Sequence, residues 1–545
     1  MKHNNLTAKI VFISLIFSNL FFINKANSQI DSNQAKSINY QASKFKYLLE
    51  MATQFHYDTL NYEKISDAAF QTLLKSMDIQ SVYYPKEEYE KLVEQNTGEG
   101  EGIGIEVVPL HDTLTVISVI HSSPADSAGI LAGDKILFIN GKSVLGLNKV
   151  EADKLIRGTI NTTVQLIIKR HPNSSSLIEF NLLRNEVNIP SVTSSFVIPE
   201  KQIGYIQITR FSEKTDSELL SALKDLKKKG MKGLVIDLRG NFGGVLESTL
   251  KSLEYFFPKN TKLLELKARY KDFDTTFYST KDGDFKDLKL VVLVDKNSAS
   301  ASEILSGVVQ DYDRGIIIGE RTYGKGSVQK VWKLNDGSGF RLTIAEYYTP
   351  SGRRIQKDLD TTNLKVLDPA MQLNMDKQTQ ENVLNALKSL GGKTQLPIYY
   401  SQNNRVIIGG GGVFPEIIMT NDTLNLLTRV LVQKGIMLEY IYQFLNSEKN
   451  NIIKNYKNDF ITFSQNFKIT DEFLENFKKY SISRNIWNEN YFQEDKEYIR
   501  NYLKALISYT LWGENGFRFI TIQEDKVAQK GIETFNNYDK YLQQK

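Results

Sequence analysis

Two short segments carry residue types from which a catalytic site could be built. Residues 297–303 read Asn-Ser-Ala-Ser-Ala-Ser-Glu, and residues 324–329 read Gly-Lys-Gly-Ser-Val-Gln. All histidines precede these segments, and the chain contains no cysteine. A serine hydroxyl is a poor nucleophile until a neighbouring base accepts its proton, and without a nearby imidazole we expect that base to be a lysine. The pattern therefore predicts a hydrolase with a serine–lysine dyad.

Ser300 lies where a strand is expected to lead into a helix. Residues 291–294 are an apolar run typical of a buried strand, and apolar residues recur at helical spacing after the serine. The first N–H groups of a helix are free and its dipole is positive there, which suits a nucleophile. The alternative is that Ser298, Ser300 and Ser302 are ordinary helix-capping residues.

Lys325 follows after enough chain for a helix and for the strand expected at residues 316–318, so the chain can return beside the serine. The glycines on both sides of Lys325 allow a close backbone approach. A lysine packed there, away from water, would have a lowered pKa and could accept a proton. The alternative is a lysine on a solvent-facing loop.

A glycine-rich turn, Asp-Leu-Arg-Gly-Asn-Phe-Gly-Gly at residues 237–244, follows another expected strand. Such a turn can offer a backbone N–H to a developing oxyanion, and the N–H of Ala301 would supply a second donor. Either Gly243 or Gly244 could be the donor from the turn. An ordinary tight turn is the alternative.

Across residues 291–329 these motifs resemble those of the C-terminal processing peptidases, which are Tsp-like serine proteases of peptidase family S41. The resemblance implies a role for each of five residues: Ser300 as nucleophile, Lys325 as general base, Gln329 as a partner that positions the lysine, and Gly244 with Ala301 as the oxyanion hole. It also implies a ClpP/crotonase-like α/β core that needs no metal ion and no cofactor.

The resemblance extends to about residues 40–418. Residues 78–84 are similar to the stretch that precedes the PDZ domain in this family, although Ile79 stands where the family usually has proline. Residues 122–136 look like part of that PDZ domain. The chain beyond residue 418 lies outside the resemblance.

The PDZ-like region is β-rich, with short apolar runs separated by glycines. By the resemblance, Gly102, Ile103, Gly104 and Ile105 form the loop whose amides receive a peptide carboxylate, followed by a strand edge for peptide addition. The domain would then bind substrates with apolar C-terminal tails. Acidic residues close to the loop leave open the alternative that the domain only braces the core.

Asp311 occupies a position at which the family also has an acidic residue. It follows Ser300 by about three helical turns, so it shares a face with the serine but lies roughly 16 Å along the axis. It cannot orient the dyad directly, and we expect a structural role near the end of the helix.

Strands and helices alternate over residues 202–349, which predicts an α/β layer fold in a multidomain chain. Apolar stripes over residues 45–52 and 70–77 are expected to be helix packing faces. The C-terminal region shows no chemical motif and is expected to be a cap, an adaptor site or a self-association surface. Five regions are predicted: a signal peptide (1–28), an N-terminal helical region (29–95), a PDZ domain (96–186), the protease core (187–420) and a C-terminal helical region (421–545).

The leader combines a basic start, an apolar stretch at residues 10–23, and small residues at Ala26 and Ser28. This pattern predicts export and cleavage after Ser28, with a periplasmic or envelope-associated product that has no stable membrane span. The alternative is a retained anchor, although about 14 residues fall short of the ~20 that span a bilayer.

The composition is that of a globular protein, with 41% hydrophobic and 24% charged residues. The net charge of +5 includes Lys2, Lys9 and Lys25 of the leader, so the mature chain is near +2. This balance gives no reason to invoke nucleic acid as a partner.

Two other functions compete with a dedicated processing protease. A non-catalytic PDZ scaffold on a decayed core should have lost Ser300, Lys325 or the glycine-rich turn, and all three are present. A protease with broad clearing activity would keep the same site.

Overall fold

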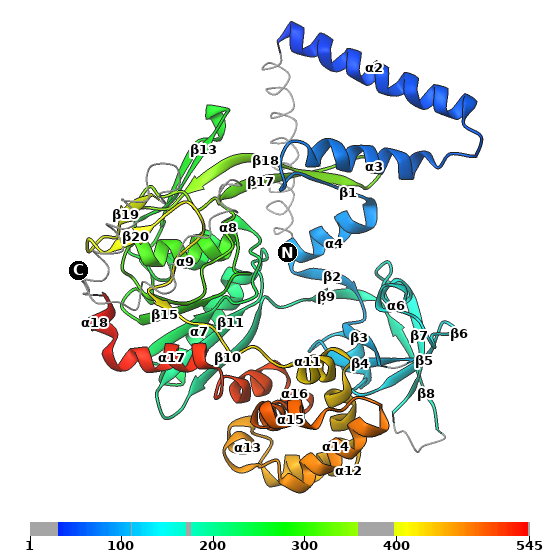
Figure 1. Ribbon diagram of the computed structural model, residues 1–545, viewed down its shortest axis with the longest axis vertical. Coiled ribbons are helices and arrows are strands. Elements are labelled where there is room, and N and C mark those ends of the chain that lie inside the picture. The colour runs from blue at the N-terminus through cyan, green and yellow to red at the C-terminus, as the bar shows by residue number, and fades with distance from the viewer. Residues whose placement is uncertain (1–30, 111, 171–175, 358–396, 543–545) are drawn as a thin grey trace, which may run out of the picture. The chain divides into compact units, whose positions relative to one another are not determined.

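The chain divides into two compact units, Met1–Tyr83 and Tyr84–Lys545. The predicted leader lies outside the described residues. Within the described part of the chain, no helix has both the length and the apolarity needed to cross a membrane. The computed structural model (Figure 1) describes these residues: 31–110, 112–170, 176–357 and 397–542.

The first unit contains the helices α2 (Ser32–Phe55) and α3 (Tyr62–Lys75), and the short strand β1 (Val82–Tyr84) begins at its end. Helix α2 contains no buried residue, and Phe45 and Leu48 of the predicted packing stripe are exposed. The expectation of a packing face is therefore wrong for α2. A periodic pattern identifies an apolar face, but burial also requires an opposing surface.

A β-rich domain opens the second unit. Its sheet has the order β3-β4-β5-β7-β8, with β6 beside β5, while β2 pairs with β9. Ile103, Val116 and Leu166 are among its fully buried side chains. The elements of this part of the chain are α4 (Lys86–Thr97), β2 (Glu99–Gly102), β3 (Ile105–Leu110), β4 (Thr113–Val119), α5 (Pro124–Ala128), β5 (Lys135–Ile139), β6 (Lys142–Ser143), α6 (Lys149–Ile156), β7 (Thr163–Lys169), β8 (Ile178–Leu183) and β9 (Asn185–Asn188).

The main sheet has the order β10-β11-β12-β15-β16-β21. Its β10 edge is antiparallel and the other neighbouring strands run parallel, which requires crossover connections such as helices. The predicted α/β alternation is confirmed. The elements are β10 (Val192–Ile198), β11 (Ile203–Ile208), α7 (Thr215–Lys228), β12 (Gly233–Asp237), α8 (Leu246–Glu254), β15 (Lys289–Val294), α9 (Ala301–Asp311), β16 (Ile316–Gly319) and β21 (Ile417–Ile418).

Both faces of this sheet are buried, as the alternation of side chains along one strand shows. In β12, Leu234 and Ile236 belong to the hydrophobic cluster that includes residues of α7, α8 and α9. Val235 belongs to a second cluster on the other face, together with Val527 and Ile532 from the C-terminal region. The C-terminal region therefore covers one face of the main sheet.

A second sheet is formed by antiparallel strands with β17 and β13 on either side of β18, and β14 beside β13. It positions Lys325, which lies two residues before the start of β17, and Tyr347, which lies near the end of β18. The strands are β13 (Lys262–Ala268), β14 (Thr275–Tyr278), β17 (Ser327–Lys333) and β18 (Gly339–Tyr348), with the separate hairpin β19 (Ile398–Tyr400) and β20 (Val406–Ile408).

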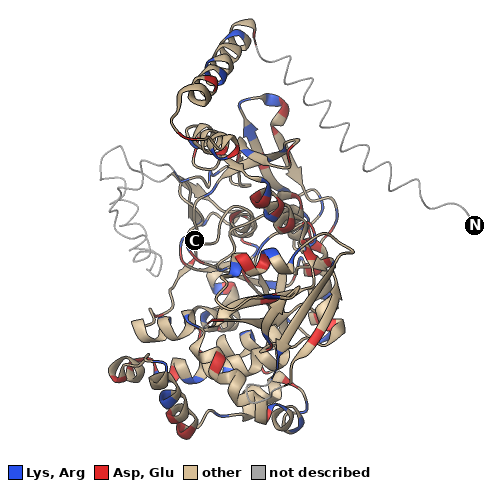
Figure 2. Ribbon diagram, turned by 90° about the vertical axis from the view of Figure 1, so that its right-hand side faces the viewer, with Lys and Arg blue, Asp and Glu red and all other residues tan. Residues whose placement is uncertain are grey.

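The C-terminal region is helical and has two parts. The first part has its own hydrophobic cluster, and the end of α16 continues with α17 onto the main sheet (Figure 1). Basic and acidic residues are interspersed along the ribbons in Figure 2. The helices are α11 (Leu426–Gln433), α12 (Ile436–Asn455), α13 (Phe460–Asn466), α14 (Asp471–Ser483), α15 (Glu489–Glu494), α16 (Lys496–Thr521), α17 (Lys526–Thr534) and α18 (Tyr538–Leu542).

Candidate active site

Ser300 differs from the two serines beside it in the loop between β15 and α9. Ser298 and Ser302 are fully buried, and their hydroxyls donate to the carbonyls of Leu238 and Asn241, each at 2.9 Å. Ser300 is half-buried and is the N-cap residue of α9, where it forms a capping box with Glu303. Ser300 therefore does occupy the capping position, but it is also the one serine of the three whose side chain is not fully buried.

The backbone of Ser300 is strained, with φ of 54° and ψ of −110° immediately before α9. A residue with a side chain in such a region costs roughly 1–3 kcal/mol, and such strain is concentrated at functional sites. Ala301 is the first residue of α9, and its N–H makes no hydrogen bond within the described part of the chain. The helix start thus presents a free donor next to the serine.

The carboxylate of Glu303 joins the Ser300 and Lys325 segments. Its Oε2 accepts hydrogen bonds from the backbone N–H groups of both residues, each at 2.8 Å. Its Oε1 accepts from the Thr322 hydroxyl at 2.6 Å and from the Gly324 N–H at 2.7 Å. Since both backbone nitrogens contact one oxygen atom, the two segments lie side by side.

Tyr347 supplies a second connection between these segments. Its buried hydroxyl reaches the carbonyl oxygen of Ser300 at 3.2 Å and that of Lys325. Burial raises the pKa of Tyr347 well above its ordinary value, so the hydroxyl keeps its proton and can donate it. Glu303 thus binds the backbone N–H groups of Ser300 and Lys325, and Tyr347 binds their backbone carbonyl groups.

The surroundings make the Lys325 amine easier to deprotonate than an ordinary lysine. Burial lowers the pKa of Lys325 to about 8, with a further lowering by the charge of Arg341 and an opposing effect of Glu303. Burial also raises the pKa of Glu303 to about 7, against the hydrogen bonds that it receives. A lysine with such a pKa is a competent proton acceptor near neutral pH.

The glycine-rich turn packs directly against the start of α9. A Cβ atom added to Gly243 would lie 2.8 Å from the Ser300 Cβ and 2.9 Å from the Ala301 nitrogen. The Gly243 N–H already donates to the Asn241 side chain at 2.8 Å. The Gly244 N–H makes no hydrogen bond within the described residues, so it is the more available of the two donors.

Gln329 lies in β17, close to Lys325 in the chain. Its side-chain amide donates to the Ser327 hydroxyl at 2.8 Å and to the Ser327 carbonyl at 3.2 Å. These contacts stabilise the start of β17, whereas the direct positioning of Lys325 by Gln329 stays a prediction.

Asp311 pairs with a residue other than the dyad. Its carboxylate lies 2.9 Å from the Arg353 guanidinium, and both side chains are almost fully buried. It also accepts the Ser351 N–H at 2.9 Å. This ion pair ties the end of α9 to the segment after β18, in agreement with the predicted structural role.

The predicted peptide-binding loop belongs to the β-rich domain and makes no described hydrogen bond or ion pair with Ser300 or Lys325. Ile103 is fully buried, so its side chain could not meet a ligand, whereas Ile105 is only partly buried. Glu99 is paired with Lys214 at 2.6 Å and Glu106 with Lys149 at 3.3 Å. These pairs reduce the negative charge that weighed against a carboxylate site.

Two site residues, Glu303 and Tyr347, were not found by sequence reasoning. A serine followed three residues later by glutamate is the capping-box pattern, and Ser300 with Glu303 matches it. That pattern could have identified Glu303 as a ligand of the Ser300 N–H, but not of the Lys325 N–H. No local signal marks Tyr347.

Three family models match separate parts of the chain. The model described as "Peptidase family S41" matches residues 202–364. A PDZ domain model matches residues 102–183, and a model described as a family of unknown function matches residues 427–513. The catalytic candidates lie in the first of these ranges and the predicted peptide-binding loop in the second.

The chain is also similar to whole proteins. It is 34% identical over 365 residues to a carboxy-terminal-processing protease of Bartonella bacilliformis, covering 66% of this chain and 82% of the relative. It is 32% identical over 413 residues to the carboxy-terminal processing protease CtpA of Bacillus subtilis, covering 72% and 87%. Among solved structures, a photosystem II D1 C-terminal processing protease has 26% identity and a TM-score of 0.32, covering 57% of this chain and 83% of that chain.

Proposed function

Because the chain belongs to the carboxy-terminal processing proteases of peptidase family S41, we propose that it cleaves protein substrates with Ser300 as nucleophile and Lys325 as general base. One observation carries the proposal: the N–H groups of both residues bind the same oxygen of the buried Glu303. The half-exposed serine and the lowered pKa of the lysine support these roles.

In the proposed mechanism the neutral Lys325 amine accepts the proton of the Ser300 hydroxyl as the oxygen attacks the scissile carbonyl. The N–H groups of Gly244 and Ala301 stabilise the oxyanion. The protonated lysine then gives its proton to the leaving amine, and an acyl-enzyme remains on Ser300. Water hydrolyses this ester with Lys325 again as the base, and the serine is regenerated.

The direct test of the nucleophile is labelling with a fluorophosphonate probe, followed by mass-spectrometric mapping of the modified peptide. We expect the label on Ser300 and none on Ser298 or Ser302, since both of these hydroxyls are buried and hydrogen-bonded. A folded protein that takes no label on any serine would contradict the proposal and would favour the non-catalytic PDZ scaffold.

The proposed base predicts how activity depends on pH. Protonated Lys325 cannot accept a proton, so kcat/KM should rise with increasing pH through the lysine pKa of about 8 and level off above it. The ionisation of Glu303, with a pKa of about 7, acts in the same direction if its carboxylate must hold the N–H groups. Initial rates on a peptide without titratable side chains measure the profile; a flat or falling profile over this range would contradict the role of Lys325.

We further propose that the PDZ domain holds the substrate by a free C-terminal carboxylate, through the backbone of Gly102, Ile103, Gly104 and Ile105. A fluorescent peptide with an apolar C-terminus should bind the Ser300→Ala protein at least about tenfold more tightly than its C-terminal amide, because the amide lacks the charge that strengthens the hydrogen bonds. Anisotropy titration measures both affinities. Equal affinities would reject carboxylate recognition.

We also propose that residues 1–28 direct export and are removed, which gives a periplasmic or envelope-associated enzyme. The basic start, the apolar stretch and the small residues Ala26 and Ser28 support this proposal. N-terminal sequencing of the protein from its producing cell should begin at Gln29, and a start at Met1 would be inconsistent with cleavage.

A further inference from the structure

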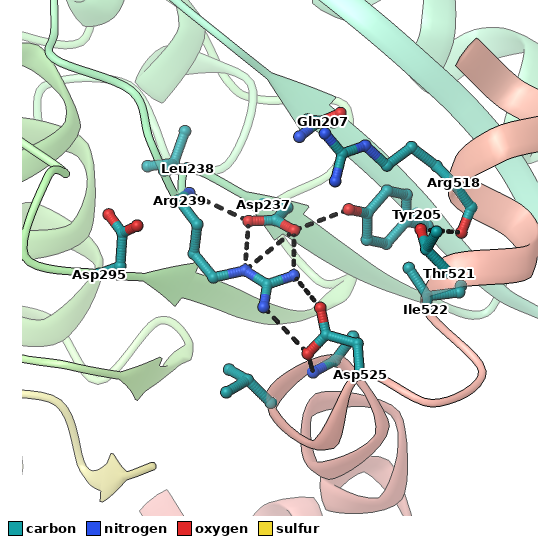
Figure 3. Close-up of polar contacts among 12 residues, drawn as sticks. Tyr205, Gln207, Asp237, Leu238, Arg239, Asp295, Arg518, Thr521, Ile522 and Asp525 are labelled. Atoms are coloured by element: carbon teal, nitrogen blue, oxygen red, sulfur yellow. Dashed lines mark hydrogen bonds and ion pairs between the residues drawn. The ribbon is translucent and has the colours of Figure 1, made fainter. Parts of the chain in front are cut away.

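The glycine-rich turn is connected to the C-terminal region through Arg239, whose guanidinium lies between two carboxylates (Figure 3). Its Nε and Nη2 donate to Asp237 at 2.9 and 2.6 Å. Its Nη1 donates to Asp525 Oδ1 at 3.0 Å, and its Nη2 lies 2.7 Å from Asp525 Oδ2. Arg239 therefore forms a two-point contact with each carboxylate, a geometry that fixes orientation as well as charge.

This group is largely shielded from water. The side chains of Arg239, Asp525 and Asp237 are 15%, 18% and 1% exposed. Burial alone would raise the pKa of Asp237, but the charge of Arg239 and the hydrogen bonds from Arg239 and Tyr205 outweigh it and lower that pKa. Asp237 and Arg239 are thus charged at neutral pH, and electrostatic attraction within this shielded group is weakly screened.

Asp525 has a second role that can be separated from the first. It is the N-cap of α17, and its Oδ1 accepts the Ala528 N–H at 3.0 Å. Asparagine caps a helix about as well as aspartate does, whereas alanine does not. Replacement by asparagine therefore keeps the cap and removes the negative charge that faces Arg239.

From Arg239 the chain enters the part of the turn that meets the nucleophile. The N–H of the next residue, Gly240, donates to Asp295 at 3.0 Å. The Asn241 carbonyl accepts the Ala299 N–H at 3.0 Å, and its side chain accepts the Gly243 N–H. A shift of Arg239 would be transmitted through these bonds to the glycines beside Ser300.

We propose that Asp525 is a positioning residue, through which the C-terminal region holds Arg239 and hence the oxyanion-stabilising turn in the catalytic arrangement. The proposal rests on the proposed protease function. It assigns the C-terminal region a part in turnover that its sequence pattern does not indicate. The alternative is that the contact only secures α17 on the sheet.

The test compares Asp525→Asn with Asp539→Asn in the full chain. Asp539 is a matched control because it is also an aspartate of the C-terminal region in an ion pair, with Lys289 at 3.2 Å, but it is 71% exposed. Asp525→Asn should lower kcat on a protein substrate about tenfold with little change in KM, since small displacements of catalytic groups cost one to two orders of magnitude. Asp539→Asn should match the wild type.

A double-mutant cycle separates positioning from general loss of stability. Lysine at position 239 keeps the charge beside Asp237 but cannot contact two carboxylates with a planar fork. Arg239→Lys should therefore lower kcat at least as much as Asp525→Asn, and the double variant should be no worse than Arg239→Lys alone. Thermal melting of each variant checks the fold, and Asp525→Asn should melt close to the wild type because Asp237 still pairs with Arg239.

Every other result would reject either the positioning role of Asp525 or the proposed protease function. If the wild type cleaves its substrate and Asp525→Asn keeps the wild-type kcat, the positioning role is rejected while the protease function stands. Additive losses in the double variant, or a lowered melting temperature with unchanged kcat, would reject it in favour of the structural alternative. If the wild type neither cleaves nor takes the fluorophosphonate label, the proposed function itself fails.

Discussion

Replacing Ser300 with alanine is expected to lower kcat by at least about 10⁴-fold on an unfolded protein substrate, because no acyl-enzyme can form without the hydroxyl. The fold should persist, since the backbone N–H at this position still donates to Glu303 after the change. Single-turnover assays with purified protein measure the residual rate, and the melting temperature reports on the fold.

Ser217→Ala is the control for the nucleophile, since Ser217 is exposed in α7 and donates only to the Lys214 carbonyl, at 2.8 Å. This variant should retain the wild-type rate. Activity of Ser300→Ala within tenfold of the wild type would show that another group attacks the carbonyl, and the role of Ser300 would have to be abandoned.

Replacing Lys325 with alanine should lower kcat by at least about 10³-fold, since a positioned general base contributes roughly 10²–10⁴-fold and this base serves both half-reactions. The Lys325→Arg variant should be almost as inactive as Lys325→Ala, because a guanidinium stays protonated at any working pH. The Lys325 N–H to Glu303 is a backbone contact and survives both changes. Rates measured across neutral and alkaline pH should also lose the rise near pH 8 that the lysine pKa predicts.

Lys333→Ala is the matched control, because Lys333 is an exposed lysine at the end of β17. It should leave both the rate and the pH profile unchanged. Full activity of Lys325→Ala, or a pH profile identical to that of the wild type, would remove the lysine from the mechanism. Labelling of Ser300 in Lys325→Ala should be slow for the same reason, which provides a check independent of substrate binding.

The family and the fold class could be predicted from local patterns. The absence of cysteine, the position of every histidine upstream, and the two segments around Ser300 and Lys325 narrow the chemistry to few possibilities. The alternation of apolar runs and helical stripes predicts the main sheet, which the structure confirms. The roles of Ser300, Lys325 and Gln329 stay predictions until they are measured.

Local patterns were insufficient where burial depends on a distant surface. The stripe in α2 is apolar, but Phe45 and Leu48 remain exposed. Conversely, the C-terminal region carries no motif, yet Val527 and Ile532 cover one face of the main sheet. A periodic pattern specifies which face of an element is apolar and leaves open what will cover it.

The sequence alone determined the protein's family, its α/β class and the identity of the candidate nucleophile and base, because these depend on residue types and short spacings. The tertiary structure decided which side chains hold them. Glu303 binds the N–H groups of two segments, and Asp525 reaches Arg239 across 286 residues of chain. Such contacts are set by the path of the chain around the sheet, and periodicity carries no information about them.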